Sequence, residues 1–256
     1  MNRIDKLFRT KKEKILSVYF TAGYPSVESV EKIILLLEKN GVDMIEIGIP
    51  YSDPLADGPV IQETGKVAIA NGMTIKNLFL QLKNIRKKTS IPLLLMGYIN
   101  PIIQFGFDRF CQSAADTGID GLIIPDLPLR EYTREYFRIV IENNLKNIFL
   151  ITPDTSEKRI RQTDDLSTGF IYMVSSASTT GKTRTFDENH IGYFKRIASM
   201  KLKNPALAGF GIYNRETKEQ LFRYVQGVII GSAYMRAIQS CNSIEEATAD
   251  FFKSLE

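Results

Sequence analysis

The stretch that decides the fold runs Asp43-Met-Ile-Glu-Ile-Gly-Ile-Pro-Tyr-Ser-Asp-Pro-Leu-Ala-Asp-Gly-Pro59. Met44 to Ile49 is apolar apart from one acid, Glu46, and predicts a strand covered on both faces, as strands are in parallel sheets. Prolines, a glycine and two further acids, Asp53 and Asp57, follow the strand. They predict a stiff polar loop at its carboxyl end, where parallel α/β folds bind their ligands.

Glu46 is the first candidate for chemistry. Burial disfavours the charged form of a carboxyl group and raises its pKa, which suits a general acid or base working near neutral pH. The alternative is a buried carboxylate that backbone donors hold for structural reasons.

Short apolar runs of strand type recur along the chain and alternate with helical patterns. The predicted strands are Ile15 to Phe20, Met44 to Ile49, Leu93 to Met96, Leu122 to Ile124, Ile148 to Ile151, Phe170 to Val174, Ala206 to Phe210 and Val228 to Ile230. Eight strand–helix units in about 250 residues predict an α/β fold of the TIM (β/α)8 barrel type, with a doubly wound open sheet as the alternative. We expect one domain over residues 1–256.

Four helical features accompany the strands. An extra helix, Asn2 to Glu13, precedes the first strand and is expected to plug or skirt the bottom of the barrel. Ser26 to Asn40 carries an apolar stripe of helical period, and Ser243-Ile-Glu-Glu246 matches a capping box. A second core-facing stripe is predicted at Tyr132, Tyr136, Phe137, Val140 and Ile141.

Composition narrows the function classes. The net charge of +4 comes from 33 basic and 29 acidic residues, and the basic ones form only short runs, so we expect no nucleic-acid partner. Cys111 and Cys241 are far apart and predict free thiols in a reducing compartment. The polar start of the chain and its short apolar stretches predict a cytoplasmic protein with no membrane association.

In a barrel, the residues at the carboxyl ends of the strands build the active site. For Asp126 we prefer a structural role, capping the following helix or bracing a loop. Tyr98 and Tyr172 are either site residues or core aromatics with satisfied hydroxyl groups. The residues at these positions are Glu46, Asp57, Tyr98, Asn100, Asp126 and Tyr172.

Three glycine-bearing segments end the last three predicted strands: Thr180-Gly181, Gly209-Phe-Gly211 and Gly231-Ser232. Glycines let backbone amides approach an anion, and the loops after strands seven and eight form the usual phosphate site of a barrel. Together they predict a phosphorylated substrate, although each glycine alone is compatible with an ordinary turn.

Other catalytic classes find little support in the sequence. One histidine, His190, with two distant cysteines does not make a conventional zinc site, so we expect no metal. No predicted strand contains a lysine, which argues against a Schiff base in the barrel interior. Acid–base chemistry by carboxyl groups on a phosphorylated small molecule remains.

The segment Glu46-Ile-Gly-Ile-Pro-Tyr-Ser-Asp-Pro-Leu-Ala-Asp-Gly-Pro59 resembles the α subunit of tryptophan synthase. The resemblance extends over the chain through Phe20-Thr-Ala-Gly-Tyr-Pro25, Met96-Gly-Tyr-Ile-Asn-Pro101, Pro125-Asp-Leu-Pro128, Gly209-Phe-Gly211 and Gly231-Ser232. It implies a TIM barrel that performs the retro-aldol cleavage of indole-3-glycerol phosphate to indole and glyceraldehyde 3-phosphate.

The resemblance also implies residue roles. Glu46 would protonate indole C3 and act as base at the glycerol hydroxyl, and Asp57 would accept the indole N–H. Tyr172 would lie near the glycerol moiety, and Tyr19, which stands where a phenylalanine is common, would line the indole pocket with Tyr98. Phe210 would pack beside a phosphate that is held by amides at Gly181, Gly211, Gly231 and Ser232.

The implied partner is a β subunit carrying pyridoxal phosphate in an α-β-β-α heterotetramer, with no cofactor in this chain. The loop from Pro50 to Asp57 would face that partner, and the loop from Ser175 to Asp187 would close over substrate. Ser176 and Ser178 depart from the usual family pattern in this second loop. Three alternatives stay open: another phosphosugar lyase or isomerase, a non-catalytic scaffold subunit, and a stand-alone indole producer.

Overall fold

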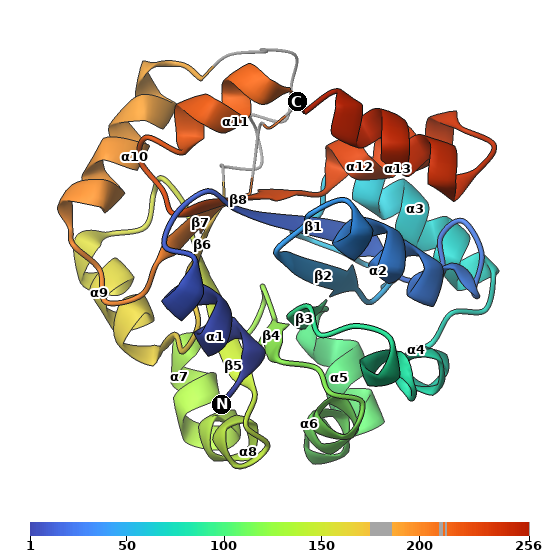
Figure 1. Cartoon of the computed structure of the whole chain (residues 1–256). Helices are drawn as coiled ribbons and strands as arrows, with labels where there is room; N and C mark the ends of the chain where they lie inside the picture. The colour runs from blue at the N-terminus through green and yellow to red at the C-terminus, as the bar shows by residue number, and fades with distance from the viewer. Residues whose placement is uncertain (175–185, 210–211, 213, 256) are drawn as a thin grey trace.

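Eight parallel strands close into a barrel in the computed structural model, which describes residues 1–174, 186–209, 212 and 214–255 (Figure 1). The order around the barrel follows the chain, and β1 pairs with β8, so the open-sheet alternative is wrong. The strands are β1 (Ile15–Thr21), β2 (Met44–Gly48), β3 (Leu93–Met96), β4 (Gly121–Ile123), β5 (Lys146–Ile151), β6 (Ile171–Met173), β7 (Ala206–Ala208) and β8 (Gly227–Ile230).

Helices surround the barrel and cover its outer face (Figure 1). They are α1 (Arg3–Thr10), α2 (Ser29–Lys39), α3 (Pro59–Ala70), α4 (Ile75–Leu82), the 3₁₀ helix η1 (Ile85–Lys87), α5 (Ile99–Phe105), α6 (Phe107–Asp116), α7 (Leu129–Glu131), the π-helix η2 (Tyr132–Tyr136), α8 (Phe137–Glu142), α9 (Glu157–Leu166), α10 (Glu188–Ser199), α11 (Arg215–Leu221), α12 (Ser232–Ser240) and α13 (Ile244–Lys253).

Alternation along each strand divides the core into two clusters. Residues such as Val18 and Phe20 point outward and pack against the helices. Inward-pointing residues fill the barrel, among them Ile15, Met44 and Leu94. Strands buried on both faces read as continuous apolar runs, which is why the sequence located all eight to within one or two residues at most of their ends.

Helix α1 closes the bottom of the barrel, as expected, and lies across its opening in Figure 1. Ile4 is fully buried among the inward-pointing residues, and Asn2 caps the helix by accepting a 2.9 Å hydrogen bond from the Ile4 amide. The helix is shorter than the predicted Asn2 to Glu13. It ends at Thr10 because Lys11 is extended and Lys14 adopts a left-handed conformation, with φ of 54°.

The predicted stripe from Tyr132 to Ile141 is only partly correct. Tyr132 and Val140 are buried, whereas Phe137 is 41% and Ile141 45% exposed. Residues Tyr132–Tyr136 form a π-helix, which takes more residues per turn than an α-helix. The wider turn rotates Phe137 and Ile141 away from the core, so a regular 3.6-residue period misplaces them.

Other local predictions need smaller corrections. The helix predicted over Ser26 to Asn40 begins at Ser29, and Ser243 accepts from the Glu246 amide as the first half of the capping box. A strand does contain a lysine, because β5 starts at Lys146. That ammonium group forms a 2.8 Å ion pair with Asp5 of α1, at the amino end of the barrel and away from its mouth.

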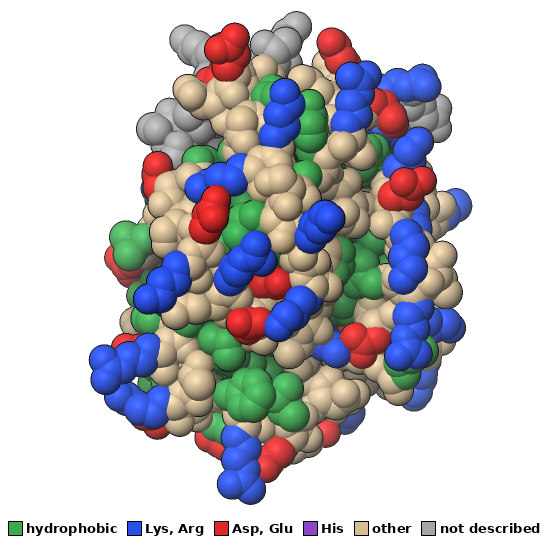
Figure 2. Space-filling model, turned by 90° about the vertical axis from the view of Figure 1, so that its left-hand side faces the viewer, with side chains coloured by type: hydrophobic (Ala, Val, Ile, Leu, Met, Phe, Trp, Pro, Cys, Tyr) green, Lys and Arg blue, Asp and Glu red, His purple; other side chains and the backbone are tan. Residues whose placement is uncertain are grey.

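Two surface features bear on possible partners. Among the described helices, none combines the length and apolar character that crossing a membrane requires. On the face shown in Figure 2, lysine and arginine side chains are scattered among acidic ones and do not gather into one basic patch.

Asp120 ties the lower parts of several elements together. Its carboxylate is 2% exposed and binds the guanidinium groups of Arg86 at 2.7 Å and Arg3 at 3.1 Å. It also accepts hydrogen bonds from the backbone amides of Leu93 and Arg3. Asp120 therefore joins α1, β3 and the segment after α4, and its negative charge is paired with groups of the fold.

Asp120→Asn is expected to lower the free energy of unfolding by about 3–5 kcal/mol, since it leaves the partly buried Arg86 without its counter-ion. Urea unfolding measures the change. Asp165→Asn is the matched control, because the exposed Lys203–Asp165 pair contributes less than about 1 kcal/mol. Equal losses in both variants would contradict this role for Asp120.

Candidate active site

Three inward-pointing polar side chains meet at the carboxyl end of the barrel. Glu46 of β2 is fully buried, and Tyr19 of β1 and Tyr172 of β6 are 8% and 7% exposed. Tyr19 and Glu46 are register partners in neighbouring strands. The pKa of Tyr172 is raised well above its ordinary value, by burial first and then by the nearby Glu46, Tyr19 and Asp57. The barrel therefore brings four predicted site residues into one electrostatic cluster.

Glu46 combines burial with an incomplete set of hydrogen bonds. Its Oε1 atom accepts a 2.8 Å bond from the Ser17 hydroxyl, while Oε2 has no partner within the described residues. Burial raises the pKa of Glu46 to about 8, against the lowering effect of the Ser17 bond. At neutral pH the group is therefore mostly protonated, as a general acid needs to be. The alternative interpretation was a structural carboxylate held by backbone N–H donors. The hydrogen bond described for Glu46 comes from a side chain instead.

Glycines make room for the two tyrosine rings. A Cβ atom on Gly48 would overlap the Tyr19 hydroxyl, and one on Gly209 would overlap the Tyr172 ring. Gly231 also borders Tyr19, because its Cβ would lie 3.3 Å from Cδ1 of that ring. Glycine at these three strand ends lets both rings lie within the barrel mouth.

Asp57 reaches the site from the loop after β2. It is half-buried, and burial raises its pKa, with the Tyr98 hydroxyl acting in the opposite direction. Tyr98 is 4% exposed, and its hydroxyl accepts a 2.9 Å bond from the Ala56 amide. Tyr98 thus holds the residue that precedes Asp57, and it packs against Tyr51 with ring centroids 5.3 Å apart.

Asp126 braces the mouth rather than capping the helix that follows it. Its Oδ1 atom accepts a 2.9 Å bond from the amide of Ile99, the first residue of α5. The loop after β4 is therefore fastened to the loop after β3. Asn100 extends this set of contacts by donating a 3.1 Å bond to the Tyr51 hydroxyl. The loop-bracing alternative for Asp126 is confirmed.

Part of the predicted phosphate site is described. Gly231 precedes α12 and Ser232 is its first residue, so the free amides of a nine-residue helix start beside Tyr19. Helix N-termini attract anions through these amides and the helix dipole. Gly181, Phe210 and Gly211, with most of the loop from Ser175 to Asp187, lie outside the described residues.

Sequence reasoning missed three residues of this region. Ser17 is a fully buried polar residue in an apolar strand, and that contrast was the available signal. Thr21 is buried and shares a 2.8 Å hydroxyl contact with Thr64. Tyr51 lies inside the quoted loop, but only the tertiary structure places it against Tyr98.

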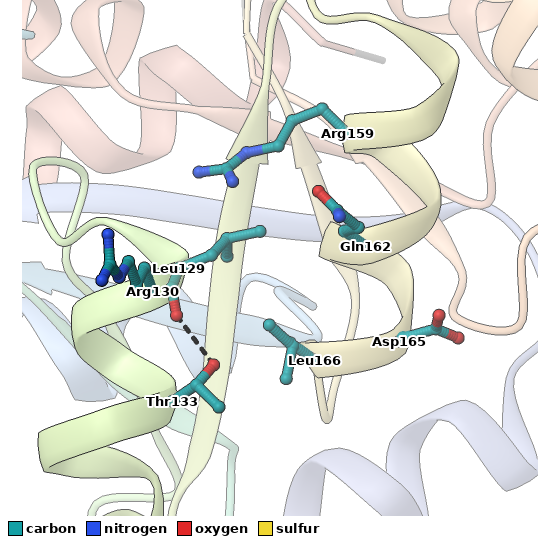
Figure 3. Close-up of a pocket in the computed structure, with 7 residues that line it drawn as sticks. All are labelled: Leu129, Arg130, Thr133, Arg159, Gln162, Asp165 and Leu166. Atoms are coloured by element: carbon teal, nitrogen blue, oxygen red, sulfur yellow. Dashed lines mark hydrogen bonds between the residues drawn. The ribbon is translucent and has the colours of Figure 1, made fainter.

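A groove of about 310 Å³ lies elsewhere, on the outside of the barrel between α7 and α9 (Figure 3). Arg130 and Thr133 border it on one side, and Arg159, Gln162 and Asp165 on the other. It shares no residue with the mouth.

His190 contacts Asp187 at 2.7 Å at the start of α10, and within the described residues no three His, Cys, Asp or Glu side chains form a metal-binding group.

Gly209→Ala is expected to cost about 1–3 kcal/mol of stability, because the added methyl group overlaps the Tyr172 ring. In a Tyr172→Ala background the cost should disappear, and a double-mutant cycle by thermal unfolding measures the coupling. Gly65→Ala is the control, since its methyl group meets open space. The same loss with and without Tyr172 would refute this packing.

Glu46 should make stability depend on pH. Its pKa is 4.5 ordinarily and about 8 in the folded chain, so its contribution is fully present below pH 4.5 and is lost as the pH rises through 8. Glu46→Gln lacks this loss. The melting temperature of the variant should gain on that of the natural chain between pH 5 and pH 8.5, and a constant difference would contradict the buried proton.

Comparison with known proteins places this chain in a family. The family model of the tryptophan synthase alpha chain matches residues 6–255. The chain is 54% identical to the tryptophan synthase alpha chain of Flavobacterium psychrophilum, over 98% of this chain and 100% of that protein. The crystal structure of tryptophan synthase subunit alpha from Legionella pneumophila superposes with a TM-score of 0.89 at 33% identity, covering 100% and 97% of the two chains. A tryptophan synthase complex from Pyrococcus furiosus contains a chain that matches with a TM-score of 0.85 at 33% identity, covering 95% and 98%. The chain belongs to the tryptophan synthase alpha chain family.

Proposed function

We propose that this chain cleaves indole-3-glycerol phosphate to indole and glyceraldehyde 3-phosphate, the carbon–carbon lyase reaction of its family. The observation that carries the proposal is the fully buried Glu46, whose pKa of about 8 keeps it protonated at neutral pH in the barrel mouth. A protonated acid near an aromatic pocket is what the first step of this cleavage requires.

In the proposed mechanism the indole ring acts as the electron sink. Glu46 transfers its proton to C3, which makes an indoleninium ion, and Asp57 accepts a hydrogen bond from the ring N–H. The carboxylate of Glu46 then removes the proton of the glycerol hydroxyl. The carbon–carbon bond breaks, its electrons return to the ring, and Glu46 recovers its proton. The cycle balances with two carboxyl groups.

The tyrosines define where substrate parts would bind. Tyr19 and Tyr98 are buried beside the loop that carries Asp57, which supports an aromatic pocket for indole. Glu46 and Asp57 both raise the pKa of Tyr172, so its ring lies close to both acids. This supports the proposal that Tyr172 lies near the glycerol moiety of the substrate. The amides at Gly231 and Ser232 would hold the phosphate together with those at Gly181 and Gly211, and Phe210 would pack beside them.

We also propose a β-subunit partner that carries the pyridoxal phosphate, with this chain holding no cofactor, in an α-β-β-α assembly. The related Pyrococcus furiosus chain comes from a tryptophan synthase complex. In the loop from Pro50 to Asp57, Leu55 is 89% exposed, which fits a surface that a partner covers.

The free Cys111 and Cys241 fit a reducing, cytoplasmic location, and the closed barrel fits one domain over residues 1–256.

The test is indole release from indole-3-glycerol phosphate, measured with the purified chain alone and with a pyridoxal-phosphate β subunit. Glu46→Gln should lower kcat by about 10²–10⁴-fold, since it loses both proton transfers. Asp57→Asn should also lower it, and Asp53→Asn, on an exposed residue of the same loop, is the control in the assay of the chain alone, because this loop is proposed to face the β subunit.

The outcomes separate the alternatives. Weak activity that rises with the β subunit supports a coupled subunit, and full activity alone would indicate a stand-alone indole producer. A chain that stimulates the β subunit without any Glu46-dependent indole release would be a scaffold. Absence of indole under both conditions would refute the proposal and favour another phosphosugar lyase or isomerase.

A further inference from the structure

Ser17 carries a buried hydroxyl group that is hydrogen-bonded to Glu46, the proposed acid. It is fully buried in β1, and its Oγ atom donates a 2.8 Å hydrogen bond to Glu46 Oε1. Strand register pairs Ser17 with Met44 and Tyr19 with Glu46. Ser17 therefore lies one interior layer closer to the bottom of the barrel than Glu46, and it binds the carboxyl group from below.

This bond distinguishes the two oxygen atoms of Glu46. A protonated carboxyl group has one carbonyl oxygen, which accepts, and one hydroxyl oxygen, which donates. If Ser17 donates to Oε1 of the neutral acid, Oε1 is the carbonyl oxygen and Oε2 carries the proton. Oε2 is buried and has no hydrogen-bond partner among the described residues, so none of them engages that oxygen.

We propose that Ser17 is a positioning residue that acts through Glu46: its bond to Oε1 fixes the carboxyl rotamer and leaves Oε2 as the atom that exchanges the proton with substrate. The inference rests on the proposed function and adds to it the atom that carries the proton and the residue that selects it. Ser17 itself does not touch substrate in this arrangement.

The same bond stabilises the charged intermediate. After proton transfer Glu46 is a buried carboxylate, and a hydroxyl donor stabilises that form by roughly the strength of a hydrogen bond to a charged group. The other titratable groups that face Glu46 are Tyr19 and Tyr172, whose pKa values are raised by burial and by the nearby acids Glu46 and Asp57, so both rings stay neutral beside it. Ser17 is the described donor that lowers the pKa of Glu46.

The kinetic test compares three single substitutions in the indole-release assay. Ser17→Ala should lower kcat by roughly 10–100-fold with little change in KM, since the bond to a charged group is lost and substrate contacts remain. Ser17→Thr keeps the hydroxyl and should retain most of the activity. Ser167→Ala is the matched control, because this buried serine hydroxyl has no described partner and lies before β6, away from the mouth.

The pH profile supplies a readout that a purely structural role would not change. The value of kcat/KM should fall on the alkaline side as Glu46 loses its proton, near pH 8 in the natural chain. Loss of the Ser17 donor raises the pKa of Glu46, so this limb should move to higher pH in Ser17→Ala and return in Ser17→Thr. A limb that stays in place, or a change in KM alone, would overturn the positioning role.

An infrared measurement tests the bond without turnover. At pH 6 exposed carboxyl groups are mostly ionised, while Glu46 is protonated and shows a carboxylic acid C=O band. Subtracting the spectrum of Glu46→Gln isolates that band, and Ser17→Ala should shift it to higher wavenumber as the hydrogen bond is lost. An unshifted band would overturn the inference. If the natural chain makes no indole but the band shifts, the proposed function fails and the Ser17–Glu46 bond stands.

Discussion

The burial of the Glu46 carboxyl group inside the closed barrel is the constraint on which the rest of the site depends. Closing eight strands leaves no room for bulk water beside this side chain, so its charged form is disfavoured and its pKa rises to about 8. An acid in that state needs one oxygen held and one free. Ser17 holds the first, and the unpartnered Oε2 is the second.

The two ends of the barrel treat polar groups differently. At the bottom, Asp120 satisfies its charge with two arginines and two backbone amides, and Asn2 caps the helix that closes the barrel. At the mouth, Glu46 and Asp57 have raised pKa values because both are buried, and no cation among the described residues offsets that burial. The paired charges at the bottom fit a stabilising role and the unpaired acids at the mouth fit the proposed chemistry, a division that is general for this fold.

The shape of the mouth also depends on how two tyrosine rings pack against glycines. Tyr19 and Tyr172 occupy the barrel interior because glycines stand opposite them at the ends of β2, β7 and β8. The loops above are joined across strands by Tyr98, Tyr51, Asn100 and Asp126, which fixes the approach of Asp57. The position of Asp57 in the loop after β2 therefore depends on contacts with the segments that follow β3 and β4.

Eight apolar runs that alternate with helical patterns favoured a closed barrel over a doubly wound open sheet, and the pairing of β1 with β8 decided between them. The sequence also identified Glu46 as an acidic residue in an apolar strand, where a buried carboxyl group needs a structural or catalytic explanation. The groups that surround Glu46 could not be read from the sequence, because strand register and barrel closure bring Ser17, Tyr19 and Tyr172 together from distant positions. Local patterns failed where the geometry departs from the regular period, as at the π-helix Tyr132–Tyr136. For Asp126 they left helix capping and loop bracing open, and the bond from the Ile99 amide decided for loop bracing. A sequence pattern carries periodicity and residue type, whereas contacts between loops depend on how the whole barrel closes.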